Sequence, residues 1–270
     1  MRKLFIIFIL IISILFTASF IASCVTAPSL PNLNFRQEMR DFVIKIAETV
    51  HLTDSSFIII PQNGQELITN TGDTDGTLQT RYMQAIDGTG REDLFYGYNG
   101  DNIATPQPEN LYMTGLLDKF EENGIEVLST DYCSTTDNIN DSYSKNYAKR
   151  YISFAATQRT LDVIPGSPAP YNETTTAVTS LTDAVNFLYL INPEGFNSKA
   201  NFLTTVDATN FDIIIMDCFY DGQGYQASEI NNLKTKPGGG RRLVIAYMSI
   251  GEAEDYRFYW NSNWTTGSPA

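Results

Sequence analysis

The sequence has almost no histidine: His51 is the single one among 270 residues. A Ser-His-Asp triad needs a histidine beside its nucleophile, and most zinc sites need several histidines or cysteines. His51 follows a predicted helix and lies far along the chain from other candidate ligands, which indicates a structural role. We therefore expect neither triad chemistry nor a metal site.

Cysteine is also scarce, with Cys24, Cys133 and Cys218 as the complete set. Three cysteines cannot build the disulfide framework of a small secreted domain. Cys133 and Cys218 each follow an apolar, strand-like run, and two buried thiols are the simplest interpretation. A single disulfide between these two residues stays open as the alternative.

Basic residues are few, and a phosphate-binding loop is missing. Lys and Arg number 18 against 31 Asp and Glu, so the formal net charge is −13. Such a surface repels nucleic acid and anionic lipid and would attract a cationic polymer, although acidity also serves solubility. The triple glycine at 238–240 precedes a strand-like run and not a helix, which is the wrong context for a phosphate loop. We expect no nucleic-acid partner, no nucleotide chemistry and no cofactor.

The longest apolar run lies at the amino terminus. Arg2 and Lys3 precede a strongly apolar stretch at 4–16, and the tetrapeptide Ile-Ala-Ser-Cys ends at Cys24, which together predict a secretory signal peptide at 1–23. The tetrapeptide resembles a bacterial lipoprotein box, which implies cleavage before Cys24, lipidation of its sulfur and a spacer at 24–34. We expect export to the bacterial cell envelope, with membrane contact through the lipid on Cys24. An ordinary cleaved signal and an uncleaved anchor helix are the alternatives.

Apolar content and periodicity indicate an α/β fold. Hydrophobic residues make up 43% of the chain, enough for one sizeable core. Apolar or β-branched runs predict strands at 57–60, 125–129, 151–155, 187–191, 213–216 and 243–248. Amphipathic stretches at 35–50 and 111–123 and a helix start near 228 alternate with these strands, which is typical of a parallel sheet. A Pro-, Ser- and Thr-rich junction at 165–180 separates two halves.

Acidic and aromatic residues follow the last predicted strand. The strand gives way at Gly251, and the residues that come next are Glu252, Glu254, Asp255, Tyr256, Arg257 and Trp260. Sites of α/β folds are built at the carboxyl ends of parallel strands, and carboxylates beside aromatic rings suit a sugar better than a phosphate. Acids matched to a helix dipole are the alternative interpretation.

Glycoside hydrolysis requires two carboxyl groups, one protonated and one ionised. Asp217 is the first catalytic candidate, because it ends a buried strand where a carboxylate is costly without a function or a partner. Glu252 is the second, since it directly follows Gly251, and Asp255 completes the catalytic set by pairing with Arg257 to orient it. A helix cap or a rim ion pair is the alternative for each carboxylate. The expected substrate-binding residues are Asn63, Glu92, Asp131, Tyr132, Tyr247, Glu254, Tyr256, Arg257 and Trp260.

Three segments of the second half are similar to one enzyme family. SIGEAEDYRFYW at 249–260, DIIIMD at 212–217 and FLYLIN at 187–192 resemble the endo-α-1,4-polygalactosaminidase-like glycoside hydrolases. The resemblance implies a (β/α)8 TIM barrel that cleaves an amino-sugar polysaccharide without metal or cofactor. A partly deacetylated, cationic polymer would suit the acidity of this chain.

Segments of the first half resemble the same family, but in a different order. FIIIPQNG at 57–64, AIDGTGREDLFYGYN at 85–99 and KFEENGIEVLSTDYC at 119–133 resemble late parts of the barrel. We therefore expect a circularly permuted barrel with a late half at 35–164 and an early half at 181–270. It is incomplete, with about six of eight strand units; the family's Tyr-Trp-Asp and Leu-Asp strands are missing, and we expect a truncation at the carboxyl end. Two partial domains in tandem and an assembly artefact of the sequence are the alternatives.

The sequence thus predicts an exported glycoside hydrolase that uses carboxylate acid–base chemistry and is inactive if its second acid belongs to a missing strand. The alternative is a polysaccharide- or solute-binding lipoprotein without catalytic activity. A complete set of carboxylates in one mouth favours the enzyme, whereas one acid among intact aromatic residues favours the binding protein.

Overall fold

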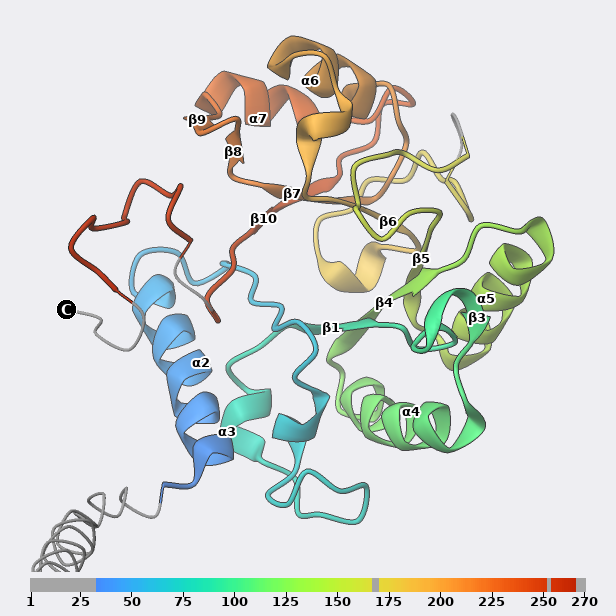
Figure 1. Cartoon of the computed structure of the whole chain (residues 1–270), viewed down its shortest axis with the longest axis vertical. Coiled ribbons are helices and arrows are strands. Elements are labelled where there is room, and N and C mark those ends of the chain that lie inside the picture. Colours follow the sequence, from blue (N-terminus) through green and yellow to red (C-terminus); the bar gives the residue numbers. More distant parts are fainter. Residues whose placement is uncertain (1–32, 167–169, 252–253, 266–270) are drawn as a thin grey trace, which may run out of the picture. The chain divides into compact units, whose positions relative to one another are not determined.

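A computed structural model describes residues 33–166, 170–251 and 254–265 (Figure 1). The chain divides into two units at residue 38, and the described strands lie in the second unit. The predicted signal peptide, Cys24 and the spacer up to residue 32 lie outside the described residues. Within the described ranges, no helix has both the length and the apolarity needed to cross a membrane.

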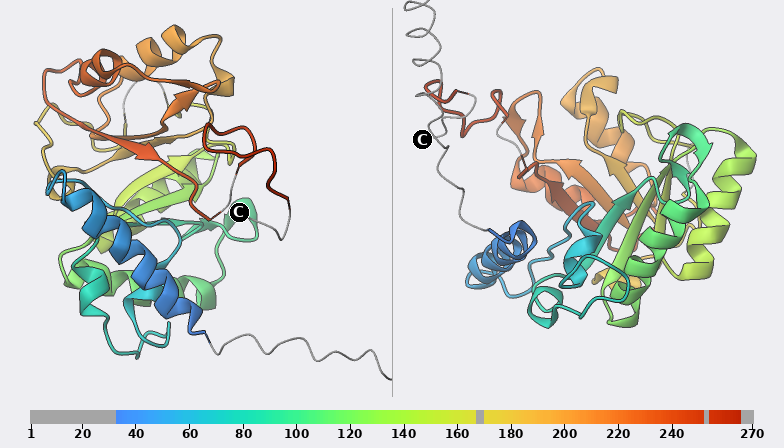
Figure 2. Two further views of the ribbon diagram at one scale, coloured as in Figure 1. Left: turned by 90° about the vertical axis from the view of Figure 1, so that its left-hand side faces the viewer. Right: turned by 60° about the horizontal axis from the view of Figure 1, so that its bottom comes forward.

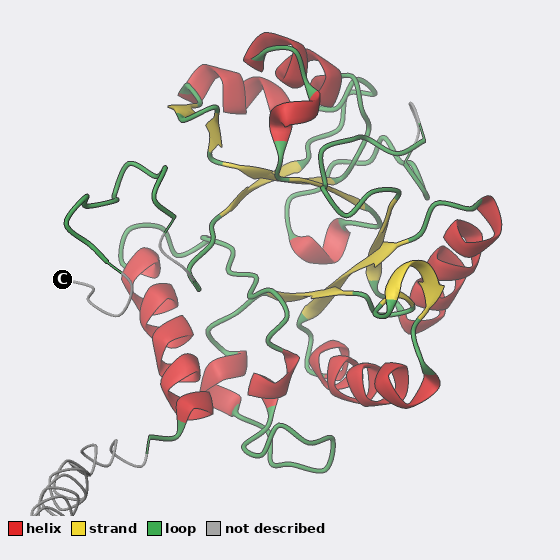
Figure 3. Ribbon diagram, in the orientation of Figure 1, coloured by secondary structure: helices red, strands yellow, loops and turns green. Residues whose placement is uncertain are grey.

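Among the described residues, six parallel strands form two sheets of three (Figure 3). The first sheet has the order β1-β4-β5, with β1 at Gly88–Glu92, β4 at Glu126–Tyr132 and β5 at Ile152–Ala156. The second has the order β10-β7-β6, with β6 at Phe187–Leu190, β7 at Ile213–Asp217 and β10 at Leu243–Tyr247. The predicted α/β fold with parallel strands is confirmed.

Helices connect consecutive strands of each sheet (Figures 1 and 2). They are α4 (Gln107–Glu122) and α5 (Thr136–Lys149) in the first sheet, and α6 (Lys199–Asp207) and α7 (Ala227–Leu233) in the second. Before β1 come α2 (Phe35–His51), η1 (Gln65–Ile68) and α3 (Thr80–Met83), whereas η2 (Leu181–Asp183) precedes β6 and η3 (Pro193–Gly195) follows it. Two antiparallel hairpins follow strand ends, β2 (Tyr96–Gly97) with β3 (Gly100–Ala104) and β8 (Phe219–Tyr220) with β9 (Gln223–Gly224).

Most of the predicted strands are confirmed, but the first is wrong. The predictions at 125–129, 151–155, 187–191, 213–216 and 243–248 correspond to β4, β5, β6, β7 and β10. At 57–60 no strand forms, and residues 59–63 instead run beside β1, where Gly90 N donates to the Pro61 carbonyl at 2.8 Å. Pro61 has no N–H group for a ladder, which limits the pairing to one bridge between Gln62 and Gly90.

Strand β1 was not predicted, because its sequence GTGRE contains no large apolar residue. Its glycine content has a steric reason at Gly90. A Cβ atom there would come 1.7 Å from the Oε1 atom of Gln62, so a larger residue at this position would require the end of the Gln62 side chain to move away from the strand. The apolar pattern therefore predicts a strand at 57–60, in the segment that lies beside β1, and not at β1 itself.

The two sheets adjoin at β5 and β6 and share a core. The rings of Phe154 in β5 and Phe187 in β6 have centroids 5.6 Å apart, and both belong to a buried cluster that also contains Ile213 of β7. A second cluster packs Val127 of β4 against α4, including Phe120. Because one cluster draws on both sheets, the sheets stabilise each other by burying apolar surface between them.

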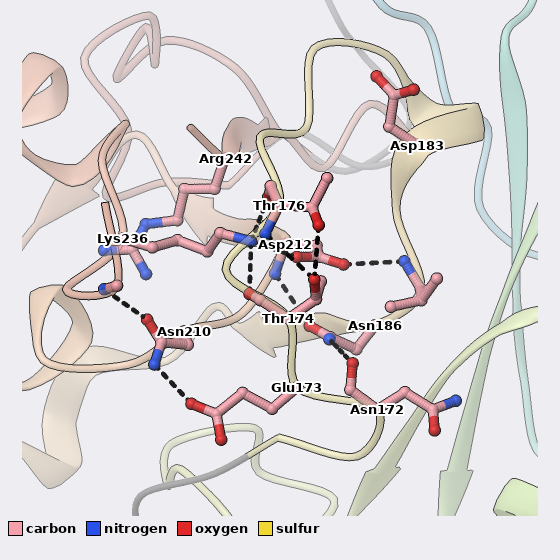
Figure 4. Close-up of polar contacts among 12 residues, drawn as sticks. Asn172, Glu173, Thr174, Thr176, Asp183, Asn186, Asn210, Asp212, Lys236 and Arg242 are labelled. Atoms are coloured by element: carbon pink, nitrogen blue, oxygen red, sulfur yellow. Dashed lines mark hydrogen bonds and ion pairs between the residues drawn. The ribbon is translucent and has the colours of Figure 1, made fainter. Parts of the chain in front are cut away.

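A buried ion pair lies at the amino ends of the strands in the second sheet (Figure 4). Asp212 directly precedes β7, its Oδ1 atom accepts from Lys236 Nζ at 2.8 Å, and both side chains are fully buried. The same Nζ atom donates to the carbonyls of Thr174 and Thr176, each at 2.8 Å. All three ammonium protons thus have acceptors, and part of the predicted junction at 165–180 is fixed to the base of this sheet.

Arg242 has a comparable role directly before β10. Its buried guanidinium donates to the carbonyls of Leu233, Thr209 and Asp207, at the carboxyl ends of α7 and α6. A cation at this place satisfies carbonyls that the helices leave without partners and opposes the negative ends of the helix dipoles. Buried charges therefore stabilise the amino-terminal edge of the second sheet, the edge that in barrel-like folds serves stability.

Replacing Lys236 with methionine should destabilise the protein by about 3–5 kcal/mol, because Asp212 would stay buried without its counter-charge. Lys234→Met is the matched control, since Lys234 lies two residues away, is only half-buried and has no part in this ion pair. Urea denaturation followed by circular dichroism measures both variants. A loss below about 1 kcal/mol for Lys236→Met would contradict the supporting role of the pair.

The raised pKa of Glu121 should make the stability of the folded protein depend on pH. Burial at the end of α4 raises the pKa of its carboxyl group to about 7, above the ordinary value of 4.5, although its Oε1 atom accepts from Val127 N at 2.9 Å. The folded state then binds more protons than the unfolded state between these values, so stability falls as pH rises from about 4.5 to about 7 and levels off above it.

Glu121→Gln should remove this slope and be more stable than the unmodified protein by about 1 kcal/mol at pH 8, a value reduced for partial solvent exposure. At pH 4 the two should unfold alike. The control is Glu122→Gln, because Glu122 is the exposed neighbour on the same helix. Thermal unfolding across pH 4 to 8 tests the idea, and an unchanged slope in Glu121→Gln would assign the effect to other groups.

Candidate functional site

Four strands end in residues predicted for the site. Strand β1 ends in Glu92, β4 in Tyr132, β7 in Asp217 and β10 in Tyr247. Because the strands are parallel, these residues lie at the carboxyl-terminal edges of their sheets, opposite the buried charges before β7 and β10. This is the edge at which α/β folds place ligand sites.

Glu92 is held by neutral donors on both carboxylate oxygens. The Tyr132 hydroxyl donates to Oε1, and Asn63 Nδ2 donates to Oε2 at 2.7 Å. Asn63 also accepts from the backbone N–H of Glu92 through its own Oδ1 at 3.0 Å, from a left-handed backbone conformation with φ 58°. Among the described residues Glu92 forms no ion pair. Three predicted site residues, Asn63, Glu92 and Tyr132, are thus brought together, and the carboxyl group has a fixed orientation.

Tyrosines connect the edges of the two sheets. Tyr132 is buried beside Glu92, and the rings of Tyr189 in β6 and Tyr247 in β10 have centroids 6.2 Å apart. Burial, together with the nearby Glu92 carboxylate and Tyr247, raises the pKa of Tyr189 well above its ordinary value. Glu92 of the first sheet therefore lies close enough to Tyr189 of the second sheet to influence the ionisation of its hydroxyl.

Asp217 forms a bidentate ion pair with Arg257. Nη1 of the arginine donates to Oδ1 at 2.9 Å and Nη2 to Oδ2 at 2.6 Å, and the two side chains are only 11% and 12% exposed. The backbone N–H of Phe219 also donates to Oδ1, at 2.8 Å. Such forked pairs are strong and directional, so the charge of Asp217 is balanced and its orientation is fixed.

The expected pair between Asp255 and Arg257 is wrong. Arg257 Nε donates instead to Glu254 at 2.7 Å, and the Tyr256 hydroxyl donates to the same carboxylate. These two hydrogen bonds lower the pKa of Glu254. The reason is a turn in which Arg257 N donates to the Glu254 carbonyl at 3.2 Å, which brings the first and fourth residues together and leaves Asp255 exposed. Glu252 lies outside the described residues.

Asp131 is buried on the opposite face of β4 from Tyr132, because successive strand residues point to opposite sides. Its carboxylate is fully buried, and it accepts from four donors at 2.6–3.1 Å, namely Phe95 N, Tyr96 N, Ser142 Oγ and Asn146 Nδ2. Burial raises its pKa, and the hydrogen bonds oppose that rise. The expectation that Asp131 binds substrate is therefore corrected, since it fastens the loop after β1 to α5.

Aromatic residues accompany the Asp217–Arg257 pair. Tyr256 is 67% exposed and its ring lies 4.9 Å from the Arg257 guanidinium, whereas Trp260 is half-buried against Trp264 with ring centroids 5.4 Å apart. Phe258 is exposed and contacts Phe219 at 5.7 Å. Of the predicted aromatic residues, Tyr256 is thus open to a ligand and Trp260 is partly used in packing.

Two residues near Glu92 were missed. Tyr189 lies within the buried strand β6, where a tyrosine among apolar residues was the available signal. Arg159 lies three residues after β5, and its guanidinium carbon is 3.9 Å from the centroid of the Tyr132 ring. The available signal was a basic residue shortly after a strand end, a position similar to that of the predicted site residue Arg257 after β10.

Other reactive groups are placed in structural roles. A ring nitrogen of His51 donates to the Phe57 carbonyl at 2.9 Å. Cys133 and Cys218 are free thiols, so the alternative of a disulfide between them is wrong, and burial raises the pKa of Cys133 to about 12, which disfavours the thiolate. In residues 33–166, 170–251 and 254–265, no three His, Cys, Asp or Glu side chains gather as metal ligands would.

Comparisons with known proteins give short similarities. No family model matches the chain. The uncharacterized protein MJ1477 of Methanocaldococcus jannaschii is 47% identical over 64 residues, which is 23% of this chain and 17% of that protein. Uncharacterized proteins of Deinococcus radiodurans and Thermotoga maritima are 36% identical over 69 residues and 34% identical over 64 residues, covering 25% and 24% of this chain and 21% and 20% of theirs. The matched part thus spans about a fifth of the length of these curated relatives.

Proposed function

We propose that the protein is an exported glycoside hydrolase that cleaves an amino-sugar polysaccharide by carboxylate chemistry. The observation that carries the proposal is Glu92, a half-buried carboxyl group at the end of β1, held by Asn63 and Tyr132 and within electrostatic range of Tyr189 in the second sheet. An oriented carboxyl group beside aromatic rings suits protonation of a glycosidic oxygen. The substrate class comes from the resemblance to endo-α-1,4-polygalactosaminidase-like enzymes.

We assign different roles to the two strand-end carboxylates. Glu92 is bound only by neutral groups, which fits a residue that exchanges a proton with the substrate. Asp217 is balanced by Arg257, which fits an ionised carboxylate that stabilises positive charge at the sugar ring. The catalytic assignment of Glu252 stays a prediction, and Asp255 keeps no orienting function.

The proposed fold is a permuted (β/α)8 barrel of which these sheets are adjoining parts. The contact between β5 and β6 supports it, because in a permuted barrel the last strand of the late half would lie beside the first strand of the early half. The continuous order from residues 59–63 through β1, β4, β5, β6, β7 and β10 also supports it. In such a barrel all strand ends would surround one mouth.

The ion pair of Asp217 favours a second candidate, a polysaccharide-binding lipoprotein without catalysis. A carboxylate locked to a guanidinium is a poor nucleophile or base, and a binding protein needs neither. Export, lipidation at Cys24 and attraction of a cationic polymer to the acidic chain are common to both candidates. The two candidates differ in whether the polymer is cut.

Glu92→Gln should lower the rate of polymer cleavage by about 10²–10⁴-fold, because the amide keeps the hydrogen bonds of Asn63 in part but cannot transfer a proton. Release of reducing ends from partly deacetylated galactosaminoglycan measures the rate. Glu122→Gln, on an exposed helix end, should retain it. Binding of the polymer without any cleavage by the unmodified protein would favour the binding protein, and full activity of Glu92→Gln would exclude the role of Glu92.

A further inference from the structure

Arg159 has a position that the proposed roles of Glu92 and Tyr132 do not yet explain. It follows β5, and its guanidinium carbon lies 3.9 Å from the centroid of the Tyr132 ring. At this distance a guanidinium stacks on an aromatic face and is attracted to it. The hydroxyl of that same ring is the donor to Glu92.

Acceptors from two other segments fix the guanidinium in place. Nη2 donates to Asp93 Oδ1 at 2.7 Å and to the Gly97 carbonyl at 3.0 Å, and Nη1 donates to Asp93 Oδ2 at 3.3 Å. Nε donates to Asp101 Oδ1 at 2.8 Å. Asp93 directly follows Glu92, and Asp101 belongs to β3, so Arg159 joins the ends of β1 and β5 to the β2–β3 hairpin. A lysine could not make this forked and stacked arrangement.

The backbone is shaped to admit the arginine. Gly97 has φ 121°, and a Cβ atom there would come 2.1 Å from Asp93 Oδ1 and 3.0 Å from Arg159 Nη2. Only glycine therefore allows the hairpin to approach the ion pair this closely. The hairpin backbone thus lies directly against the pair formed by Arg159 and Asp93.

The stacked guanidinium acts on a tyrosine that remains a proton donor. Burial and the Glu92 carboxylate raise the pKa of Tyr132 well above its ordinary value, and the charge of Arg159 only partly opposes this rise. The Tyr132 hydroxyl therefore stays protonated and donates to Glu92 across the physiological pH range. Arg159 thus contacts the face of the ring that carries this donor.

We propose that Arg159 is a positioning residue that stacks on Tyr132, keeps its hydroxyl hydrogen-bonded to Glu92, and thereby orients the carboxyl group toward the glycosidic oxygen. The effect on catalysis rests on the proposed hydrolase function, whereas the effect on the geometry does not. The two parts are therefore measured separately.

The kinetic test uses Arg159→Met, Tyr132→Phe, the double variant and Arg159→Lys. Arg159→Met should lower kcat on the polymer about tenfold with KM changed by less than about twofold, because the acid is misplaced while most sugar contacts persist. The double variant should be no slower than Tyr132→Phe, since both changes remove the same hydrogen bond. Arg159→Lys should be intermediate. Arg81→Met is the control, because Arg81 forms an exposed pair with Glu48 at 2.8 Å.

Crystal structures of the unmodified protein and Arg159→Met provide the second readout, which needs no activity. We expect the Tyr132 hydroxyl to leave Glu92 in the variant. If the unmodified protein cleaves polymer but the losses of Arg159→Met and Tyr132→Phe add in the double variant, Arg159 does not act through Tyr132. If no polymer is cleaved, the hydrolase function fails, and the structures alone decide: Tyr132 still bonded to Glu92 in Arg159→Met would overturn the positioning role, and its displacement would support it.

Discussion

One buried carboxylate, Asp131, holds together the parts of the first sheet on which the candidate site depends. Burying a charge is costly, and here four hydrogen bonds from the loop after β1 and from α5 offset that cost. Asp131 and Tyr132 are neighbours on β4 and point to opposite faces. Asp131 thus fixes the loop that follows Glu92, while the Tyr132 hydroxyl donates to Glu92 itself. Strand alternation makes one short segment serve both stability and the site.

The second sheet separates charge along its strands. At the amino-terminal edge, Lys236, Asp212 and Arg242 are fully buried and use their polar atoms within the fold. At the carboxyl-terminal edge, Asp217 and Arg257 pair in a place that solvent still reaches. Parallel strands make this division natural, because every connecting helix returns the chain to the same edge before the next strand begins. The charges at this edge are therefore oriented by their partners and stay partly accessible to solvent.

The sequence predicts those strands and strand ends that a local run of apolar or β-branched residues marks. Tyr132, Asp217 and Tyr247 each lie within or directly after a recognisable apolar or β-branched run, so these strand ends could be predicted, whereas the strand that ends in Glu92 has no such run. Partner choice was not local. Arg257 forms ion pairs with Asp217 at the end of β7 and with Glu254 in its own turn, and neither pair can be derived from sequence spacing alone. Arg159 and Tyr189 were missed because only the packing of distant strands brings them to Glu92. Strand alternation already implies that Asp131 and Tyr132 point to opposite faces of β4, so the two neighbours cannot both face one ligand.

The contacts of the segment at 165–180 limit where the chain can be cut into fragments that keep their buried hydrogen bonds. Thr174 and Thr176 belong by composition to a Pro-, Ser- and Thr-rich linker, yet their carbonyls are acceptors for Lys236, 62 and 60 residues further along. A fragment that began after residue 176 would retain β6, β7 and β10 but would leave the lysine with one of its three acceptors. A fragment that contains β6, β7 and β10 therefore needs part of the Pro-, Ser- and Thr-rich segment in addition to the residues that follow it. Its boundary must lie before Thr174, within what the composition presents as a linker.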